Sequence, residues 1–423
     1  MDHLNSAKST VVAFSRWLAI SQLLLMAVTW RLWTPQSAFP QVPLIRAACD
    51  WPAWIDWAFL AVQVVASLLL LVAGGMARTK RVACVVLAIC WGMMFTLDQH
   101  RLQPWAWQFY LLAIVLSLSA DLTAIQCCRW LALSIYFWSA ISKLDSDFFH
   151  QQGPALIGGL KQAIGIRVST NPGTGKFDVW LSVGLAVGEL LIAIALARPG
   201  FRRIGLWAAT VMHLILMAAL GPRGLNHSWG VLLWNVYFIG QDWILFRQRF
   251  DPRTPAETTS SSRELLLKPR LGVGDRIAAC LIGAMALWPA VEPLGRCDHW
   301  LAWAVYSPRS DRCRVLELQN PAGNLVEVNL GRESLNLLNV PIYPQLRFQV
   351  GVELQRIRET GATGYFICQN KSGVPLPPQR QPKQTDAKVN ELIVDLEDLE
   401  TWSNSFFWNA KPRQISGPPN AKP

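Results

Sequence analysis

The chain of 423 residues contains 52 % hydrophobic but only 16 % charged residues, and its mean hydropathy is +0.25. Soluble domains carry about 25 % charged residues, so this composition excludes disorder, collagen and coiled coil and favours a polytopic membrane protein. The net charge of +11 lies in short basic clusters between apolar runs. This placement indicates orientation in a bilayer, with membrane lipids as partners, and not the binding of nucleic acid.

Nine segments are apolar enough to cross a membrane as helices, for which about 20 residues are needed. We expect the first to be retained as a span, because no cleavage site of small residues follows it. The expected spans lie near residues 12–30, 57–77, 82–97, 104–120, 123–142, 178–197, 203–220, 228–246 and 276–294.

The basic residues predict the orientation of these spans. Arginine and lysine gather in the connections at 78–81, 198–203 and 247–276, and basic connections face the cytoplasm. With nine spans, all three fall on the side of the N-terminus. The sequence therefore predicts an integral protein of the cell membrane with a cytoplasmic N-terminus and an external C-terminus.

Composition divides the chain into an all-α membrane bundle at 1–296, a small β-rich outer domain at 297–372 and a partly disordered tail at 373–423. Within the outer domain, residues 346–354 alternate between apolar and polar, the period of a strand. Shorter strands are expected near 315–318, 325–330 and 365–368. In the tail, segments 373–388 and 409–423 are expected to be disordered, and an aromatic cluster at 402–408 either covers the sheet or touches the membrane surface.

The loop at 143–177 contains an apolar patch, Ala155 to Ile166, that is too short to cross the bilayer. We expect a re-entrant or interfacial helix there. Among the outward cysteines, Cys297 and Cys313 form a candidate disulfide at the start of the predicted sheet. No metal-ligand spacing is found, so no metal is predicted.

Ionisable side chains inside membrane spans are costly and therefore mark candidate sites. Tyr136, Ser139 and Lys143 are spaced by three and four residues at the outer end of the fifth span, so one helical face presents all three. Lys143 either extends to the interface or lies in an apolar pocket, where burial favours the neutral amine and makes it available as a base.

Glu189 and His213 lie at similar depths in the sixth and seventh spans, which form an antiparallel hairpin. They can meet as a structural pair, or as a proton relay or the polar wall of a cofactor cavity. Asn235 can add a hydrogen bond. Asp98, His100 and Arg101 are expected to be solvated at the outer mouth of the bundle.

The segment from Tyr136 to Asp147, with Lys143-Leu144-Asp145 at its centre, resembles the tyrosine-to-Lys-Leu-Asp segment of vitamin K-dependent gamma-carboxylases and of the wider HTTM (horizontally transferred transmembrane) domain proteins. The resemblance covers roughly residues 10–295. It implies that Lys143 is the base that deprotonates a reduced, vitamin K-like quinone at the outer face, as in a carboxylase or quinol-epoxidase-like lyase. Tyr136, Ser139, Asp145, Glu189 and His213 are expected to shape the pocket.

Two alternatives remain open at this point. The chain could be a redox-associated membrane protein resembling the DoxX or MauE group, in which outward cysteines cycle between thiol and disulfide. It could also be a non-catalytic scaffold whose outer domain binds a protein partner.

Overall fold

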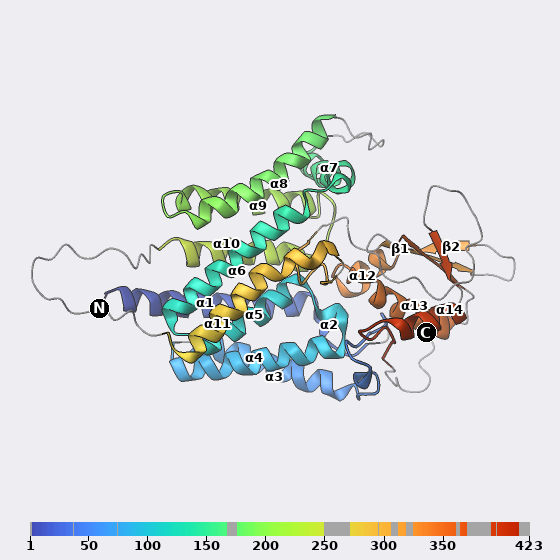
Figure 1. The fold of residues 1–423 in the computed structure, drawn as a ribbon, viewed down its shortest axis with the longest axis horizontal. Coiled ribbons are helices and arrows are strands. Elements are labelled where there is room, and N and C mark those ends of the chain that lie inside the picture. Colours follow the sequence, from blue (N-terminus) through green and yellow to red (C-terminus); the bar gives the residue numbers. More distant parts are fainter. Residues whose placement is uncertain are drawn as a thin grey trace, which may run out of the picture.

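The computed structural model describes residues 2–413 apart from positions 37, 74, 167–175, 249–270, 295, 306–311, 319–324, 361–363, 370–390 and 395. Long helices run side by side and form a bundle, and a smaller C-terminal region follows it (Figure 1). The bundle helices are α1 (Asp2–Val28), α3 (Trp54–Ala73), α4 (Ala77–Leu97), α5 (Pro104–Leu118), α6 (Asp121–Ser142), α8 (Lys176–Ala197), α9 (Arg202–Leu220), α10 (Trp229–Phe246) and α11 (Val273–Leu287).

Seven helices in the described part of the chain are long and apolar enough to cross a membrane: α1, α3, α4, α6, α8, α9 and α11 with the turn that extends it. The chain is therefore an integral membrane protein. The prediction of nine spans is not supported. The fourth expected span, α5, has 15 residues and is about 22 Å long at the usual helical rise. The eighth, α10, contains Asn235, Gln241 and Asp242, which lower its hydropathy.

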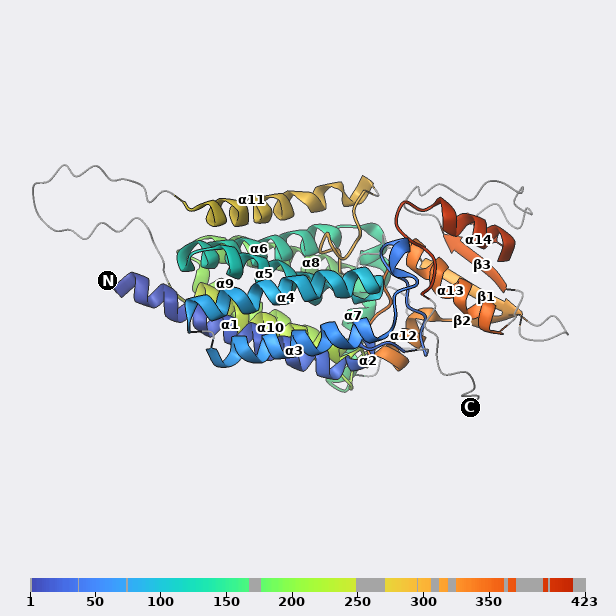
Figure 2. The same ribbon diagram turned by 90° about the horizontal axis from the view of Figure 1, so that it is seen from below.

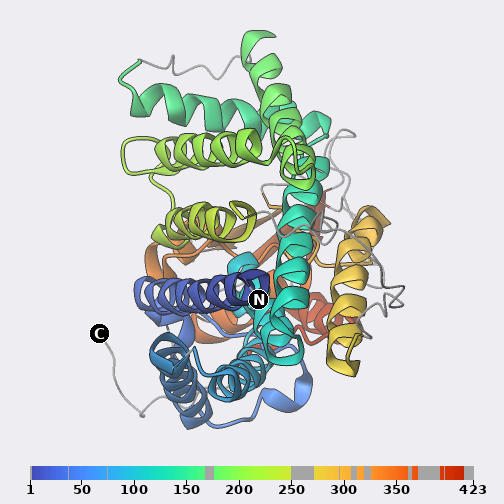
Figure 3. The ribbon, with the colours of Figure 1, turned by 90° about the vertical axis from the view of Figure 1, so that its left-hand side faces the viewer.

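The bundle is layered around α1, α6 and α10. Viewed along the bundle, α8 and α9 lie at one side and α3 and α4 at the opposite side (Figures 1 and 3). Helix α1 packs against both α3 and α10, and α6 packs against both α8 and α11. The N-terminus lies at one end of the bundle and the C-terminal region at the other (Figure 2).

A short helix, α7 (Gly153–Ala163), follows a π-helical turn at Phe148–Gln152 and packs against α8 and α9. It confirms that the apolar patch in the predicted loop is helical. Pro154 lies in its first turn, where the missing N–H costs no hydrogen bond. At Gly159 a Cβ would come within 2.6 Å of the Ala219 carbonyl oxygen, so α7 approaches α9 closely because this residue has no side chain.

The C-terminal region is mixed, and the predicted β-rich domain is not supported. Four short antiparallel strands form a sheet in the order β2-β1-β3-β4, and three of them overlap the short strands expected from the sequence. The elements are β1 (Arg312–Leu318), β2 (Leu325–Val328), α12 (Leu330–Leu338), α13 (Leu346–Thr360), β3 (Gly364–Gln369), β4 (Glu391–Val394) and α14 (Leu396–Ser405). Of these three helices, α13 packs against β1, α14 packs against α13, and α12 packs against α2 (Trp30–Trp33).

Helix α13 replaces the longest predicted strand. Every residue from 346 to 354 is buried, including the polar residues between the apolar ones. Arg347, for example, donates to Gln99 of the bundle at 2.7 Å and to Asp298 at 2.9 Å. Because residues 346–354 are buried on every side of this part of the helix, the apolar alternation does not mark one buried face of a strand, and the strand prediction is wrong.

The end of the chain is ordered further than predicted. Residues 373–388 lie outside the described residues, whereas 409–413 pack into the molecule, with Ala410 and Arg413 fully or almost fully buried. The residues of the aromatic cluster at 402–408 differ in burial. Trp402 on α14 is 1 % exposed, while Phe407 is 92 % exposed.

Candidate functional site

A cavity of about 70 Å³ lies between α6, α8, α9 and α10, beside α7. Its walls are mostly apolar, with aromatic rings from Phe148, Trp234 and Phe238. Five of the sequence-predicted polar residues reach it from three different helices. These are Tyr136, Ser139, Lys143, Glu189 and His213, and Asn235 of α10 joins them.

Lys143 ends α6 and is 8 % exposed. Its Nζ donates to Glu189 Oε2 of α8 at 2.5 Å and to Ser139 Oγ, one turn earlier, at 2.6 Å. A buried ammonium without a partner costs several kcal/mol, and the carboxylate compensates it. The lysine therefore does not extend to solvent. It forms an ion pair across the helix interface at the edge of the cavity.

His213 and Tyr136 form a second polar group on the cavity wall. His213 Nδ1 lies 2.8 Å from Asn235 Oδ1, and His213 Nε2 lies 2.7 Å from the Tyr136 hydroxyl. That hydroxyl is also 2.6 Å from Asp242 Oδ2 of α10. Asp242 is 1 % exposed and does not line the cavity. The network thus extends from the cavity into the interior of the bundle.

Two expectations about these residues need correction. Glu189 pairs with Lys143 and not with His213, although both line the same cavity. Asp145 does not line the cavity, because it lies past the end of α6, where its carboxylate accepts the backbone N–H of Asp147 at 2.8 Å. Asp242 was not among the residues singled out in the sequence. The available signal was an acidic residue inside an apolar helix, which is costly unless it is paired.

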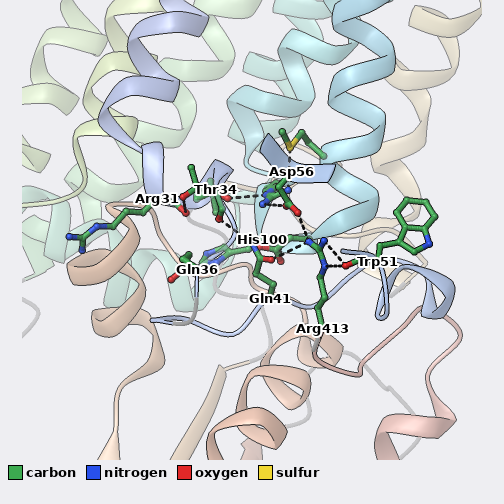
Figure 4. Close-up of polar contacts among 12 residues, drawn as sticks. Arg31, Thr34, Gln36, Gln41, Trp51, Asp56, His100 and Arg413 are labelled. Atoms are coloured by element: carbon green, nitrogen blue, oxygen red, sulfur yellow. Dashed lines mark hydrogen bonds and ion pairs between the residues drawn. The ribbon is translucent and has the colours of Figure 1, made fainter. Parts of the chain in front are cut away.

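A separate polar cluster joins the bundle to the end of the chain (Figure 4). Asp56 of α3 pairs with Arg101 at 2.6 Å and with Arg413 at 2.7 Å, and the side chains of all three are fully buried. Arg413 also donates to the carbonyls of Trp51 and Pro52. This cluster fixes residues 409–413 against the bundle.

Asp98, His100 and Arg101 are buried, so the expectation that they are solvated is wrong. Burial raises the pKa of Asp98 to about 6 and lowers the pKa of His100 to about 4. His100 Nε2 lies 3.1 Å from the Pro341 carbonyl and 3.2 Å from Ser334 Oγ. The C-terminal region covers this mouth of the bundle and excludes water from it.

The predicted disulfide between Cys297 and Cys313 is not present, because Cys297 is a free thiol. Its pKa is raised to about 12, chiefly by burial. The backbone register instead places Cys313 of β1 opposite Cys368 of β3. The sequence contains no spacing signal for this pairing, since the two residues are brought together by the sheet.

The cavity suits the chemistry of an apolar ring with a hydroxyl group, because its walls are apolar and an amine and a carboxylate lie together at one edge. Its volume of about 70 Å³ does not suit a whole bicyclic ring, since an engineered cavity that binds the smaller benzene ring measures about 150 Å³. A quinone would enter fully only if side chains that line the cavity moved. Among the described residues no group of three or more His, Cys, Asp or Glu could hold a metal ion.

The fold and the cavity define an integral membrane protein with a buried, ion-paired lysine in a mostly apolar pocket. In comparisons with known proteins, no family model matches the chain, and neither a curated protein nor a solved structure matches it.

Proposed function

We propose that this protein is a membrane enzyme of the HTTM and gamma-carboxylase type in which Lys143 abstracts a proton from a ligand in the cavity. The observation that carries the proposal is the burial of the Lys143 amine in a cavity that also presents Glu189, Tyr136 and His213. Ionisable side chains inside membrane spans are costly and rare, and those that occur usually have a function. The resemblance of the segment around Lys143 to that family points to the same residue.

Lys143 and Glu189 can exchange one proton at the 2.5 Å contact between Nζ and Oε2. With the proton on the carboxylate, the amine is neutral and its lone pair can accept a proton from the ligand. The resulting ammonium is again held by Ser139 Oγ. The apolar walls exclude water, which strengthens these interactions. After this step the pair carries one net positive charge, on Lys143, and the negative charge of the deprotonated ligand balances it.

The ligand class that we propose is a reduced quinone of the vitamin K type, which would supply a weakly acidic ring hydroxyl. The mostly apolar lining with aromatic side chains supports this class. The side chains of Phe148, Trp234 and Phe238 would contact the ring.

For the orientation, we propose a cytoplasmic N-terminus and an external C-terminal region in the cell membrane. Two observations support it: the basic connections gather on one side of the spans, and the N-terminus and the C-terminal region lie at opposite ends of the bundle (Figure 2). Lys143 ends α6, and Val305, just before the C-terminal sheet, lines the cavity, so the site would open near the outer face. A protein partner could bind the external region.

The test is oxygen uptake and epoxide formation by the full chain in proteoliposomes supplied with reduced naphthoquinone. We expect turnover that Lys143→Ala lowers by about 100-fold or more, the usual contribution of a general base. Lys161→Ala is the matched control, because Lys161 also forms a salt bridge, with Asp178 at 2.7 Å, but does not line the cavity.

Absence of turnover, or equal turnover in the Lys143→Ala variant, would contradict the proposal. Because the single substitution leaves Glu189 buried without its partner, the double variant Lys143→Met with Glu189→Gln removes both charges together. We expect this double variant to fold and to be inactive, which separates loss of the base from loss of the fold.

A further inference from the structure

The side chain of Asn235 determines which nitrogen of His213 carries a proton. Asn235 Nδ2 donates to the Val231 carbonyl at 2.8 Å, so its Oδ1 faces the imidazole. An amide oxygen only accepts hydrogen bonds. His213 Nδ1, at 2.8 Å from that oxygen, must therefore carry a hydrogen.

The Tyr136 hydroxyl then has two neighbours and one proton. It lies 2.7 Å from His213 Nε2 and 2.6 Å from Asp242 Oδ2. If it donates to a neutral His213 at Nε2, its oxygen must accept a hydrogen from Asp242, which is then a carboxylic acid. If it donates to an Asp242 carboxylate, it must accept from Nε2–H, and His213 is then an imidazolium.

Both arrangements contain the same number of protons. One changes into the other when the Asp242 Oδ2–H bond breaks as a Tyr136 O–H bond forms, while the original Tyr136 O–H bond breaks as a His213 Nε2–H bond forms. Asp242 loses a proton and His213 gains one, with no external acid or base. Both hydrogen bonds are short enough for these transfers, and all three side chains are buried.

We infer that Asp242, Tyr136 and His213 form a proton relay that places a positive imidazolium on the cavity wall when an anion forms beside Lys143. This use of the relay rests on the proposed function. His213 and Tyr136 line the cavity, whereas Asp242 acts through them and is a positioning residue. A ligand that loses its proton to Lys143 becomes negative, and an imidazolium nearby stabilises that charge in a water-excluded site.

The structure offers few other groups to perform this task. Apart from Lys143, which receives the proton of the ligand, none of the described residues that line the cavity is an arginine or a second lysine. The relay therefore places an imidazolium on the cavity wall only while the ligand is an anion. At other times the proton stays on Asp242. A permanent buried cation in this place would cost several kcal/mol.

The experiment measures protonation directly and needs neither quinone nor turnover. The full chain is labelled with ¹⁵N in its histidine rings and reconstituted in lipid. The protonation state of His213 is measured by NMR, with assignment by His213→Gln, and the carboxylic acid C=O band of Asp242 is measured by infrared spectroscopy, with assignment by Asp242→Asn. We expect reciprocal states: an acid band with a neutral imidazole, or a carboxylate with an imidazolium.

Tyr136→Phe keeps both titratable groups and removes the atom between them, so we expect it to change the His213 and Asp242 signals together. Tyr237→Phe is the matched control, since this buried tyrosine donates to Gln241 at 2.8 Å and lies outside the relay. A carboxylate beside a neutral imidazole in the unchanged protein, or signals unaffected by Tyr136→Phe, would overturn the relay. Loss of oxygen uptake with reciprocal signals intact would count against the proposed function alone.

Discussion

Each ionisable side chain discussed above that lies inside the molecule has a partner, and this determines how it can act. Lys143 meets Glu189, and Asp56 meets two arginines at 2.6 and 2.7 Å. Removing one partner of such a pair costs about 3–5 kcal/mol, because the other charge stays buried, whereas removing both can be nearly neutral. Single substitutions at these sites therefore report stability as well as function, and double variants are needed to separate the two.

The first prediction concerns His100, whose pKa is lowered from 6.5 to about 4 by burial. The folded protein keeps the imidazole neutral while the unfolded chain takes up a proton below pH 6.5. The stabilisation by His100 is therefore complete above pH 6.5 and is lost as the pH falls toward 4. The shift corresponds to about 3 kcal/mol. Asp98 opposes it, since its raised pKa adds stability as the pH falls through about 6.

His100→Gln isolates the histidine contribution, because glutamine can still donate to the Pro341 carbonyl that His100 Nε2 contacts at 3.1 Å. We expect its melting temperature in detergent to fall less between pH 7 and pH 4.5 than that of the unchanged protein. His150→Gln, at an exposed position, serves as the control and should keep the original profile. Identical pH profiles for His100→Gln and the unchanged protein would show that His100 is not responsible.

The residues on the cavity face of α6 could be predicted from sequence because their relationship is local. Spacings of three and four place Tyr136, Ser139 and Lys143 on one side of a helix, and the structure has all three at the cavity. The partners of these residues could not be predicted, because they depend on packing between helices. Glu189 meets Lys143 only because α8 contacts α6, and Asp242 reaches Tyr136 only through the position of α10.

At the scale of elements, the sequence pattern failed where a helix has no exposed face. Residues 346–354 alternate like a strand, yet in α13 all nine of them are buried, and polar residues among them such as Arg347 have partners inside the molecule. Hydrophobic periodicity identifies a helix only when one face is solvated or touches lipid. Residues 409–413 were expected to be disordered from their composition. They pack against the bundle through contacts that a sequence pattern does not record.

The second prediction tests how closely α7 must approach α9. A Cβ at Gly159 would lie 2.6 Å from the Ala219 carbonyl oxygen, a backbone atom that cannot move aside alone. We expect Gly159→Ala to separate the two helices, to lower the melting temperature, and to enlarge the cavity, because Leu156 on the same helix lines it. The adjacent Gly158→Ala is the control, since nothing lies within 4 Å of its Cβ position.

Thermal unfolding monitored by circular dichroism measures both variants under the same conditions. Gly158→Ala should be neutral or slightly stabilising, because alanine favours a helix over glycine by about 1 kcal/mol. If the two variants melt at the same temperature, the close contact between α7 and α9 does not contribute to stability.

At the scale of the molecule, the bundle and the C-terminal region form a continuous core. Buried side chains of α13 belong to the same hydrophobic cluster as those of α1 and α4. Arg347 on α13 donates to Gln99 at the end of the bundle that the C-terminal region covers, at 2.7 Å, and Asn409 donates to the Pro43 carbonyl at 2.9 Å. The C-terminal region is thus part of the fold that closes one end of the bundle.

The third prediction follows from this closure. Deleting residues 409–423 removes Arg413 and leaves the buried Asp56 with Arg101 as its remaining ion-pair partner in the described structure. It also removes the hydrogen bonds that Arg413 donates to the carbonyls of Trp51 and Pro52. We expect this deletion to destabilise the whole chain by about 3–5 kcal/mol, the usual result of breaking a buried ion pair, and to lower the melting temperature of the bundle itself.

Deleting only residues 414–423 keeps Arg413 and is the matched control, with an expected melting temperature close to that of the intact chain. Asp56→Asn introduced into the longer deletion should lower the stability further, because it removes the carboxylate that still pairs with the buried Arg101. A bundle that melts at the same temperature after both deletions would mean that residues 409–413 cover this end of the bundle without stabilising it. The distinction matters for the site, since Val305, just before the C-terminal sheet, lines the cavity.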